Sequence, residues 1–322
     1  MAPSETVPTV SEFLDEATWT RRERLHRDRV DTFLEPHLRR QRAGEAHPVW
    51  DFLFTYYSLR PRQLRRWHPG FGVVLGGDRA RGYLTRSGYG GHPDGVTVTR
   101  AHLLARADTV RFIAELLHAT ASRPPRLNCF GLHEWAMVYR APEVRHSQLP
   151  LRLGAAGTDA VVESISLRCS HFDAYRFFTA PAVQRNCEPL SRAGQIRSEQ
   201  PGCIHAAMDL YKWAYKLGPL VASELLMDCL ELAAAARAVD MRASPYDLSG
   251  YGFMPIAVET AAGRAQYVRA QQQIAAGAEP LRAALQNACT LLPPESNRPV
   301  GREIDPVPNP VEHAEMVGVT HG

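Results

Sequence analysis

The sequence predicts an α+β fold that is mainly α-helical with a small β-sheet, arranged as one globular domain over residues 11–292. Several long segments repeat their apolar residues with the spacing of an amphipathic helix, whereas strand-like runs are few and short. A chain of 322 residues, of which 45% are hydrophobic and 22% charged, is also long enough to bury a substantial core. Residues 1–10 are predicted to be a flexible tail, and the proline-rich residues 293–322 a second tail that is disordered or lies along the surface.

The first half of the domain predicts three helical regions and one strand. Residues 11–42 have the apolar spacing of one or two amphipathic helices, and a short aromatic helix follows that ends at Pro61. The sequence FGVVLGG at 71–77 predicts a strand that runs into a turn, and GYGGHPDG at 88–95 predicts a mobile, glycine-rich loop. Residues 99–122 predict a long helix, and the proline pair at 124–125 indicates where it ends.

The second half of the domain predicts a strand and three further helices. Residues 160–178 begin as a strand, and residues 200–219 predict a helix that ends at a Gly-Pro pair. The strongest helical pattern covers residues 221–241, where Ser223 is a candidate N-terminal cap. A last helix is predicted over about residues 261–292.

The composition argues for a cytoplasmic protein that does not enter a membrane. No apolar run approaches the roughly 20 residues that span a bilayer, and the polar, acidic N-terminal residues do not have the pattern of a signal peptide. The six cysteines are far apart and include no C-x-x-C pair, so we interpret them as reduced and mostly buried thiols. No feature of the sequence predicts a protein partner.

Positive charge and aromatic residues concentrate together near the N-terminus, in a basic and aromatic part that covers residues 21–70. Residues 21–68 contain 12 arginines and 6 acidic residues, and the segment FLFTYYSLRPRQLRRWHPG alternates arginines with aromatic rings. Arginine can hold phosphate while a ring stacks on a base, so Tyr57 and Trp67 are candidate nucleic-acid-binding residues. The alternative is a basic amphipathic segment with core aromatics and solvated arginines.

Polar chemistry concentrates between residues 126 and 255, most clearly on the predicted helix 200–219. Four side chains there share one face, at the spacing i, i+4, i+7 and i+11: His205, Asp209, Lys212 and Lys216. The last two are the only lysines among 37 basic residues, and an amine, unlike a guanidinium, can act as a nucleophile. The next helix carries acidic residues at the same spacing: Glu224, Asp228 and Glu231. The two faces therefore predict either a salt-bridged seam or a polar pocket around Asp209 and Lys212.

Two shorter segments add candidate site residues. In NCFGLHEW, a strand would send His133 and Glu134 to opposite faces, so only one of them, more readily His133, would line a given cavity. In CSHFDAYRFF, a strand would place His171 and Asp173 on one face, a spacing that suits a metal site, an acid–base pair or an ordinary surface strand. Two arginines flank this pair: Arg168 and Arg176.

The segment DMRASPYDLSGYGFMP is predicted to be a loop that closes over a site, because binding residues gather on loops held by rigid elements. Its candidates for binding are Asp240, Arg242, Tyr246 and Asp247. The alternative is an Arg–Asp pair that only fixes the loop.

Four of these segments, FLFTYYSLRPRQLRRWHPG, RCSHFDAYRFFT, EQPGCIHAAMDLYKWAYKLGPL and DMRASPYDLSGYG, resemble a bacterial family commonly labelled 3-methyladenine DNA glycosylase. The resemblance covers most of residues 20–285. It implies a DNA partner, an alkylated purine as substrate, hydrolysis of the N-glycosidic bond and no cofactor. The chain lacks the glycine-rich hairpin of the helix-hairpin-helix glycosylases and the Cys and His ligands of the zinc-containing alkyladenine glycosylases.

A glycosylase of this kind flips the nucleotide, stacks the alkylated base on aromatic rings and stabilises the sugar cation with a carboxylate. Asp209 or Asp173 would supply the carboxylate, with His171 beside them, and Lys212 would be the amine of any lyase step. The stacking wall would come from Trp213, Tyr211 or Phe172.

The alternative prediction is a metal-dependent oxidase, oxygenase or hydrolase that acts on a small molecule. Three histidines from separate segments, with carboxylates such as Glu134 near them in sequence, can supply two histidines and one carboxylate for Fe(II) or another divalent ion: His133, His171 and His205. The pattern Glu-x-x-His, which is used in di-iron bundles, also occurs twice, at Glu115/His118 and Glu143/His146. A third prediction is a protein that binds nucleic acid or a small molecule without catalysis.

Overall fold

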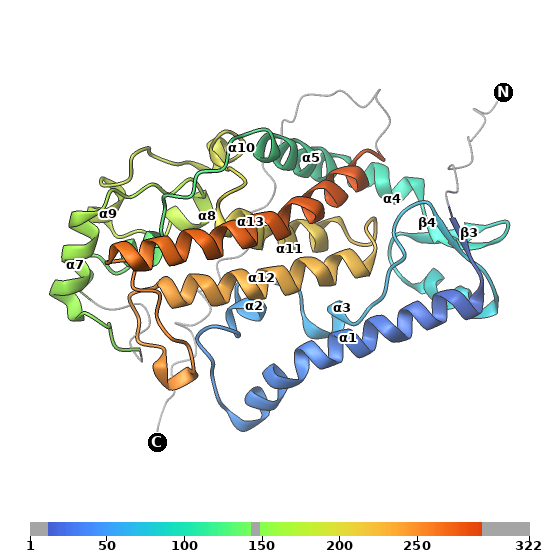
Figure 1. Cartoon of the computed structure of the whole chain (residues 1–322). Helices are drawn as coiled ribbons and strands as arrows, with labels where there is room; N and C mark the ends of the chain where they lie inside the picture. The colour runs from blue at the N-terminus through green and yellow to red at the C-terminus, as the bar shows by residue number, and fades with distance from the viewer. Residues whose placement is uncertain (1–11, 143–148, 292–322) are drawn as a thin grey trace, which may run out of the picture. The chain divides into compact units, whose positions relative to one another are not determined.

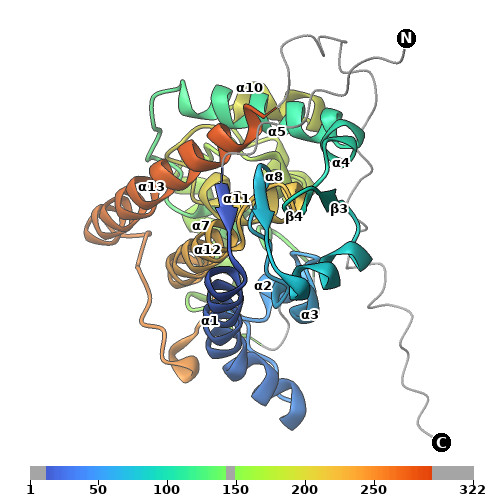
Figure 2. The same ribbon diagram turned by 90° about the vertical axis from the view of Figure 1, so that its right-hand side faces the viewer.

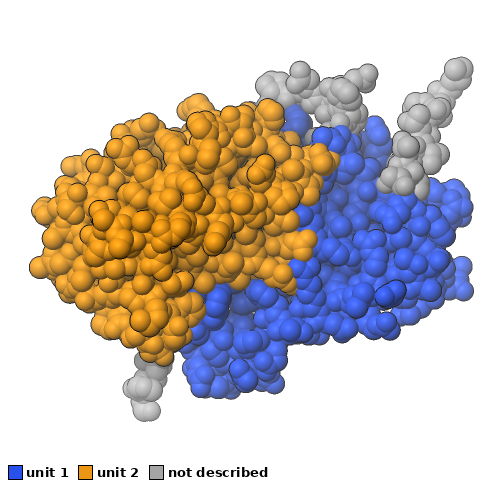
Figure 3. All heavy atoms as spheres, in the orientation of Figure 1, with its two compact units in different colours: residues 1–112, 215–226, 288–322 blue, residues 113–214, 227–287 orange. Residues whose placement is uncertain are grey.

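A computed structural model describes residues 12–142 and 149–291. The predicted tails and the Glu143/His146 pair lie outside these residues. Over the described residues the protein is mainly α-helical with one four-stranded sheet, which confirms the predicted fold class (Figure 1). The chain divides into two compact units: unit 1 has residues 12–112, 215–226 and 288–291, and unit 2 has residues 113–214 and 227–287 (Figure 3).

Unit 1 contains the sheet, whose strands lie in the order β1-β2-β4-β3. β1 is parallel to β2, while β4 pairs in the antiparallel sense with β2 and β3. The strands are β1 (Glu12–Leu14), β2 (Val73–Leu75), β3 (Tyr89–His92) and β4 (Gly95–Val98). The short helices between and after the strands are α2 (Phe52–Thr55), α3 (Pro61–Leu64), the 3-10 helix η1 (Asp78–Thr85) and α4 (Arg100–Ala105).

The long helix α1 (Glu16–Ala43) begins one residue after β1, which lies beside β2 (Figure 2). Asp15 caps its N-terminus by accepting a hydrogen bond of 2.7 Å from the Thr18 backbone N–H, and Gly44 ends it in the left-handed conformation. The helix was predicted from residue 11, but residues 12–14 form a strand because they pair with β2. The rest of the predicted helix is confirmed.

The predicted glycine-rich loop at 88–95 is wrong, because these residues form most of the β3–β4 hairpin. Gly95 is required where the backbone of β2 passes close by: a Cβ atom on it would lie 2.0 Å from the Leu75 carbonyl oxygen. The glycines therefore allow a close approach between strands and do not mark a loop. The helix predicted over 99–122 is interrupted at Arg106 and continues as α5 (Ala107–Ala121).

Unit 2 is built around three long helices that lie side by side in Figure 1: α11 (Ile204–Leu217), α12 (Ser223–Ala243) and α13 (Ala261–Cys289). All three predicted helices are confirmed. Ser223 is not the predicted N-terminal cap of α12 but its first helical residue, and its hydroxyl accepts a hydrogen bond from the His68 backbone N–H. Shorter helices complete the unit: α6 (Leu132–Ala136), α7 (Gly154–Ser164), α8 (Phe172–Tyr175), α9 (Ala180–Val183), α10 (Gln195–Ser198) and the 3-10 helices η2 (Arg192–Gly194) and η3 (Ser249–Tyr251).

Two strand predictions in unit 2 are wrong. The run that begins at Ala160 belongs to α7, whose Val161 and Val162 side chains are buried in the core, so tertiary packing overrides the strand propensity of the branched residues. The segment around His133 is the helix α6. Among the described residues, no helix is long and apolar enough to cross a membrane.

Gly95→Ala tests the close approach between β2 and the β3–β4 turn. The added methyl group overlaps the Leu75 carbonyl, so we expect the free energy of unfolding to fall by about 1–3 kcal/mol. The matched control is Gly91→Ala in the same hairpin, where a Cβ atom meets nothing within 4 Å and the change should stay within about 0.5 kcal/mol. Urea unfolding of the two variants checks this, and equal stabilities would contradict it.

Candidate metal centre

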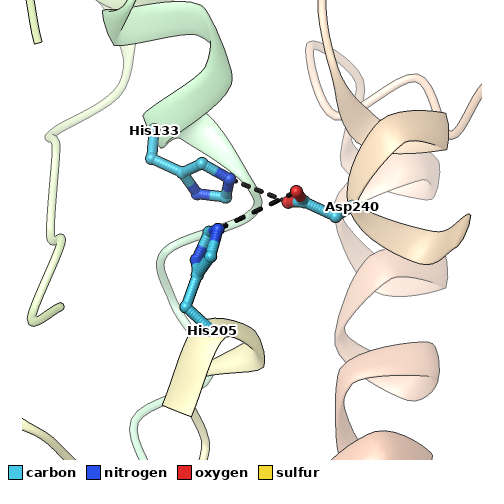
Figure 4. Close-up of side chains that lie close together, drawn as sticks. All are labelled: His133, His205 and Asp240. Carbon is cyan, nitrogen blue, oxygen red and sulfur yellow. Dashed lines mark ion pairs between the residues drawn. The ribbon is translucent and has the colours of Figure 1, made fainter. Parts of the chain in front are cut away.

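Three side chains of unit 2, two of them buried and His205 half-buried, converge on one point from three separate helices (Figure 4). His133 is on α6, His205 is in the first turn of α11, and Asp240 is in the last turn of α12. His133 Nε2 lies 2.8 Å from Asp240 Oδ1, and His205 Nε2 lies 3.9 Å from Asp240 Oδ2. One donor atom from each residue can be chosen so that all three lie within 4.8 Å of one another. We call these residues the His-His-Asp triad.

Local packing explains why α6 faces the end of α12. Gly131 begins α6 with a positive φ of 70°, and a Cβ atom on it would lie 3.1 Å from Ala243 Cβ. The Trp135 indole N–H then donates a buried hydrogen bond of 2.8 Å to the Ala243 carbonyl. Because Ala243 is one turn beyond Asp240, these contacts hold His133 against Asp240.

His133 Nε2 and Asp240 Oδ1 form a buried ion-pair contact of 2.8 Å, but the ring nitrogen is poorly aligned with the carboxylate oxygen for a hydrogen bond. Neither atom makes a well-aligned hydrogen bond among the described residues. Ligand atoms that are each about 2.1 Å from a shared ion lie roughly 3–3.5 Å apart at tetrahedral or octahedral angles. The triad distances of 2.8 and 3.9 Å lie on either side of this range and involve different oxygens of Asp240, and one donor atom from each residue lies within 4.8 Å of the other two, so small side-chain adjustments would allow the three residues to hold a common ion.

The charges favour cation binding at Asp240 and His205, whereas at His133 a proton competes with it. Burial tends to raise the pKa of Asp240, but His133, His205 and Arg237 together bring it below its ordinary value, so the carboxylate stays ionised. Burial, reinforced by the neighbouring His133, brings the pKa of His205 well below its ordinary value. A neutral imidazole keeps a lone pair for a metal ion. Burial also lowers the pKa of His133, but Asp240 outweighs this effect and the net shift is upward.

Arg237 supports the triad from one turn earlier in α12. Its guanidinium donates to Asp240 Oδ2 at 3.0 Å and to Glu134 Oε1 at 2.9 Å. The first bond fixes the orientation of the Asp240 carboxylate. The second explains why Glu134, a predicted metal ligand, is not part of the triad, since its carboxylate is held by Arg237.

A second buried cluster surrounds Lys212 on α11. The ammonium group donates to Asp173 Oδ2 at 2.7 Å and to Asp209 Oδ2 at 2.8 Å, and Arg192 donates to Asp173 Oδ1 at 2.7 Å. Burial tends to raise the pKa of Asp173, but Lys212, followed by His171 and Arg192, brings it below its ordinary value. Lys212 is therefore a buried partner of two carboxylates. The structure brings together Asp173, Asp209 and Lys212, the residues that the glycosylase prediction requires.

His171 lies between the two clusters. Its Nε2 is 3.3 Å from Asp209 Oδ2 and 3.7 Å from Glu199 Oε1, and its ring centre is 5.4 Å from that of His205. Neither ring nitrogen has a hydrogen bond within the described residues. The structure therefore places this predicted metal ligand beside the triad, but its Nε2 faces carboxylates. His171 is the residue before α8 and Asp173 is in that helix, so the predicted strand is wrong although both side chains face α11.

A small pocket opens onto the triad. His133 and His205 are in its wall, together with Arg168, Ser170 and Gln200, and the cavity volume is about 20 Å³. Such a volume has room for about one water-sized group. A metal ion on the triad would therefore lie next to a space that a small ligand can enter.

The aromatic candidates for base stacking are buried within their own units. In unit 2, Tyr211 and Trp213 are buried, and Lys212 Nζ lies 4.5 Å from the centre of the Trp213 ring. In unit 1, Tyr57 and Trp67 are core residues, and the Trp67 indole N–H donates to Glu224 at 3.0 Å. These rings form core packing and are not exposed stacking surfaces.

The other predicted binding residues have structural partners, with one exception. Arg176 Nε lies 3.6 Å from Asp173, and Arg242 donates to the Met254 carbonyl. Tyr246 is buried and forms an isolated bridge with Leu151, while Asp247 accepts a hydrogen bond from the Ser249 backbone N–H. The exception is Arg168 at the pocket. The segment predicted to close over a site is thus held by its own contacts, and Asp240 is in α12, not in a loop.

The sequence predicted a salt-bridged seam between the polar face of α11 and the acidic face of α12, but two of the residues predicted to form it have other partners. Lys212 pairs with Asp173 and Asp209, and Glu224 accepts hydrogen bonds from Arg22 and Trp67 within unit 1. Polar residues that the sequence did not reveal complete the two clusters instead: Gln195, Glu199, Arg192 and Arg237. The one available signal was Arg237, a charged residue in the apolar run LAAAARAVDM of a helix.

Comparisons of the chain with protein-family models, with curated proteins and with solved structures found no match. The resemblance to the glycosylase family therefore stays a prediction from sequence. The site is defined by its geometry.

Asp173→Asn tests the Lys212 cluster. Breaking a buried ion pair costs about 3–5 kcal/mol, so we expect a loss of stability of this size at pH 7. Folding lowers the pKa of Asp173, so its contribution is present above the unfolded pKa of about 3.9 and is lost as the pH falls through the lower folded value. The difference between wild type and variant should therefore shrink below about pH 4, as measured by urea unfolding at several pH values.

The matched control for this measurement is Asp78→Asn. Asp78 pairs with Arg81 at 3.5 Å, but both side chains are exposed, so its loss should change stability little at any pH. An equal effect of the two substitutions would show that the buried cluster is not an important source of stability.

Proposed function

We propose that the protein is a metal-dependent enzyme that binds one divalent transition-metal ion on His133, His205 and Asp240 and acts on a small molecule. The observation that supports this most strongly is the triad itself. Its three donors come from three helices and meet in the interior of unit 2, and two of them line a pocket.

The set of donors indicates the class of metal. Two histidines and one carboxylate with open coordination positions are typical of non-haem Fe(II) sites, and a similar set binds catalytic zinc. We take Fe(II) as the first candidate. Three protein ligands leave coordination positions for substrate or water, and a bound metal would act there as a Lewis acid.

The balance of buried charge supports the same proposal. Among the described residues of unit 2, five buried side chains are carboxylates: Glu134, Asp173, Glu199, Asp209 and Asp240. Three buried side chains carry a permanent positive charge: Lys212, Arg237 and Arg282. Arg192 offsets one of these charges from the surface by pairing with Asp173, and a cation on the triad would offset negative charge that remains, which is costly in a protein interior.

The DNA N-glycosylase prediction stays a prediction, and less of the geometry supports it. Its carboxylates and Lys212 do lie together, but the ammonium is buried and donates to both Asp173 and Asp209. Of the proposed stacking rings, Tyr211 and Trp213 are buried and Phe172 is half-buried, and the pocket of about 20 Å³ is small for a purine base. The metal-dependent function therefore accounts for more of the site.

The metal content of the purified protein tests the proposal. Protein prepared without oxygen and dialysed against Fe(II), Mn(II) or Zn(II) should retain about one ion per chain, because the triad is a single three-ligand site. We expect His205→Ala and Asp240→Asn to weaken binding at least about 100-fold, since even the loss of a residue that only orients a ligand costs 10- to 100-fold. Elemental analysis and equilibrium dialysis measure both quantities.

The control variant is His118→Ala, which removes an exposed histidine on α5 that belongs to the first Glu-x-x-His pattern. It should bind metal as the wild type does. Circular dichroism identifies any variant that fails to fold. A folded wild type that retains no metal under any of these conditions would refute the proposal.

The glycosylase prediction has its own assay. If it is correct, the protein releases free base from methylated duplex DNA, and borohydride traps an adduct that Lys212→Arg abolishes. Because the Lys212 ammonium is buried and paired, we expect neither product from the wild type. Base release that persists after complete removal of metal would favour the glycosylase over the metal-dependent enzyme.

A further inference from the structure

The pocket beside the triad has an uneven charge. Its wall contains no carboxylate among the described residues, but it contains one permanent cation, Arg168, next to the two histidines. The acidic residues of both clusters lie behind this wall. A ligand that enters the pocket therefore meets one arginine and any metal bound to the triad, and both attract negative charge.

Arg168 is available to a ligand. Its side chain is exposed, and it makes no ion pair or hydrogen bond within the described residues. The two nearest arginines in sequence that contact the site are already engaged, since Arg176 and Arg192 both pair with Asp173. Arg168 is the one arginine in the wall of the pocket that could bind an anion there.

The backbone around Arg168 is held in place. The Asn186 side chain accepts a hydrogen bond of 2.8 Å from the Cys169 N–H and donates one of 3.1 Å to the Cys169 carbonyl. On the other side, the Leu167 carbonyl accepts a hydrogen bond of 3.0 Å from the Cys187 N–H. Both neighbours of Arg168 are therefore fixed, so this residue of the pocket wall belongs to a rigid segment.

We propose that the substrate of this site is a small carboxylic acid, whose carboxylate pairs with Arg168 while a neighbouring oxygen binds the metal on the triad. The planar guanidinium matches a carboxylate through two parallel hydrogen bonds. The volume of about 20 Å³ leaves little room beyond the polar end of such an acid, so only the smallest acids are candidates. This inference rests on the proposed metal-dependent function and makes Arg168 the residue that selects the substrate by charge.

The test uses the full chain loaded with Co(II), whose visible spectrum reports new ligands. Glycolate, a small 2-hydroxy acid, should change the spectrum at lower concentration than glycolamide, its uncharged counterpart, or phosphate. We expect Arg168→Ala to weaken glycolate binding about 10- to 100-fold, because a hydrogen-bonded charge pair is lost, without changing the Co(II) content. Arg168→Lys should lie between the wild type and the alanine variant.

The charge-matched control is Arg185→Ala, which removes an arginine that donates to the Glu163 carbonyl and does not line the pocket. It should bind glycolate as the wild type does. Equal binding of glycolate and glycolamide, tighter binding of phosphate, or wild-type binding by Arg168→Ala would each overturn the assignment while leaving the metal site intact. Failure of the wild type to retain Co(II) would instead refute the metal centre on which it rests.

Discussion

The site depends on the burial of one carboxylate. Asp240 is completely shielded from solvent near the end of α12, and an ionised carboxylate in that position must be compensated by nearby positive charge or by strong donors. Arg237 supplies part of this by bonding to Oδ2, and His133 approaches Oδ1. The hydrogen bond from Trp135 to the end of α12 fixes the position of α6, and this position places His133 against the Asp240 carboxylate.

The same constraint links the two polar clusters of unit 2. Arg237 joins Asp240 to Glu134, and Lys212 joins Asp173 to Asp209, so each of these two buried cations is shared by two carboxylates. The rings of His205 and His171 lie between these groups, with their centres 5.4 Å apart. A shared network of this kind is sensitive to any change of charge, because removing one partner leaves another buried charge without compensation.

The sequence predicted the fold class, the three long helices of unit 2 and strand β2, because each has a clear periodic pattern of its own. It failed where the reason for a residue was a distant contact: Gly95 permits the approach of Leu75, and Val161 and Val162 are packed in a helix despite their strand propensity. The face of α11 with His205, Asp209 and Lys212 followed from helical spacing. Their partners could not be predicted in the same way, because Glu199 and Arg192 lie in short, irregular segments and Asp240 was assigned to a loop.

The two clusters differ in how their carboxylates are compensated, and this difference indicates where an exchangeable cation would bind. Asp173 and Asp209 share the Lys212 ammonium at 2.7 and 2.8 Å, which is a covalently attached cation. Arg237 donates to Oδ2 of Asp240, whereas Oδ1 has the less well aligned contact of 2.8 Å with His133 Nε2. That oxygen faces His133, and both His133 and His205 open onto the pocket. A metal ion at the triad would compensate Asp240 as Lys212 compensates the other pair, and it would do so where a small molecule can reach it.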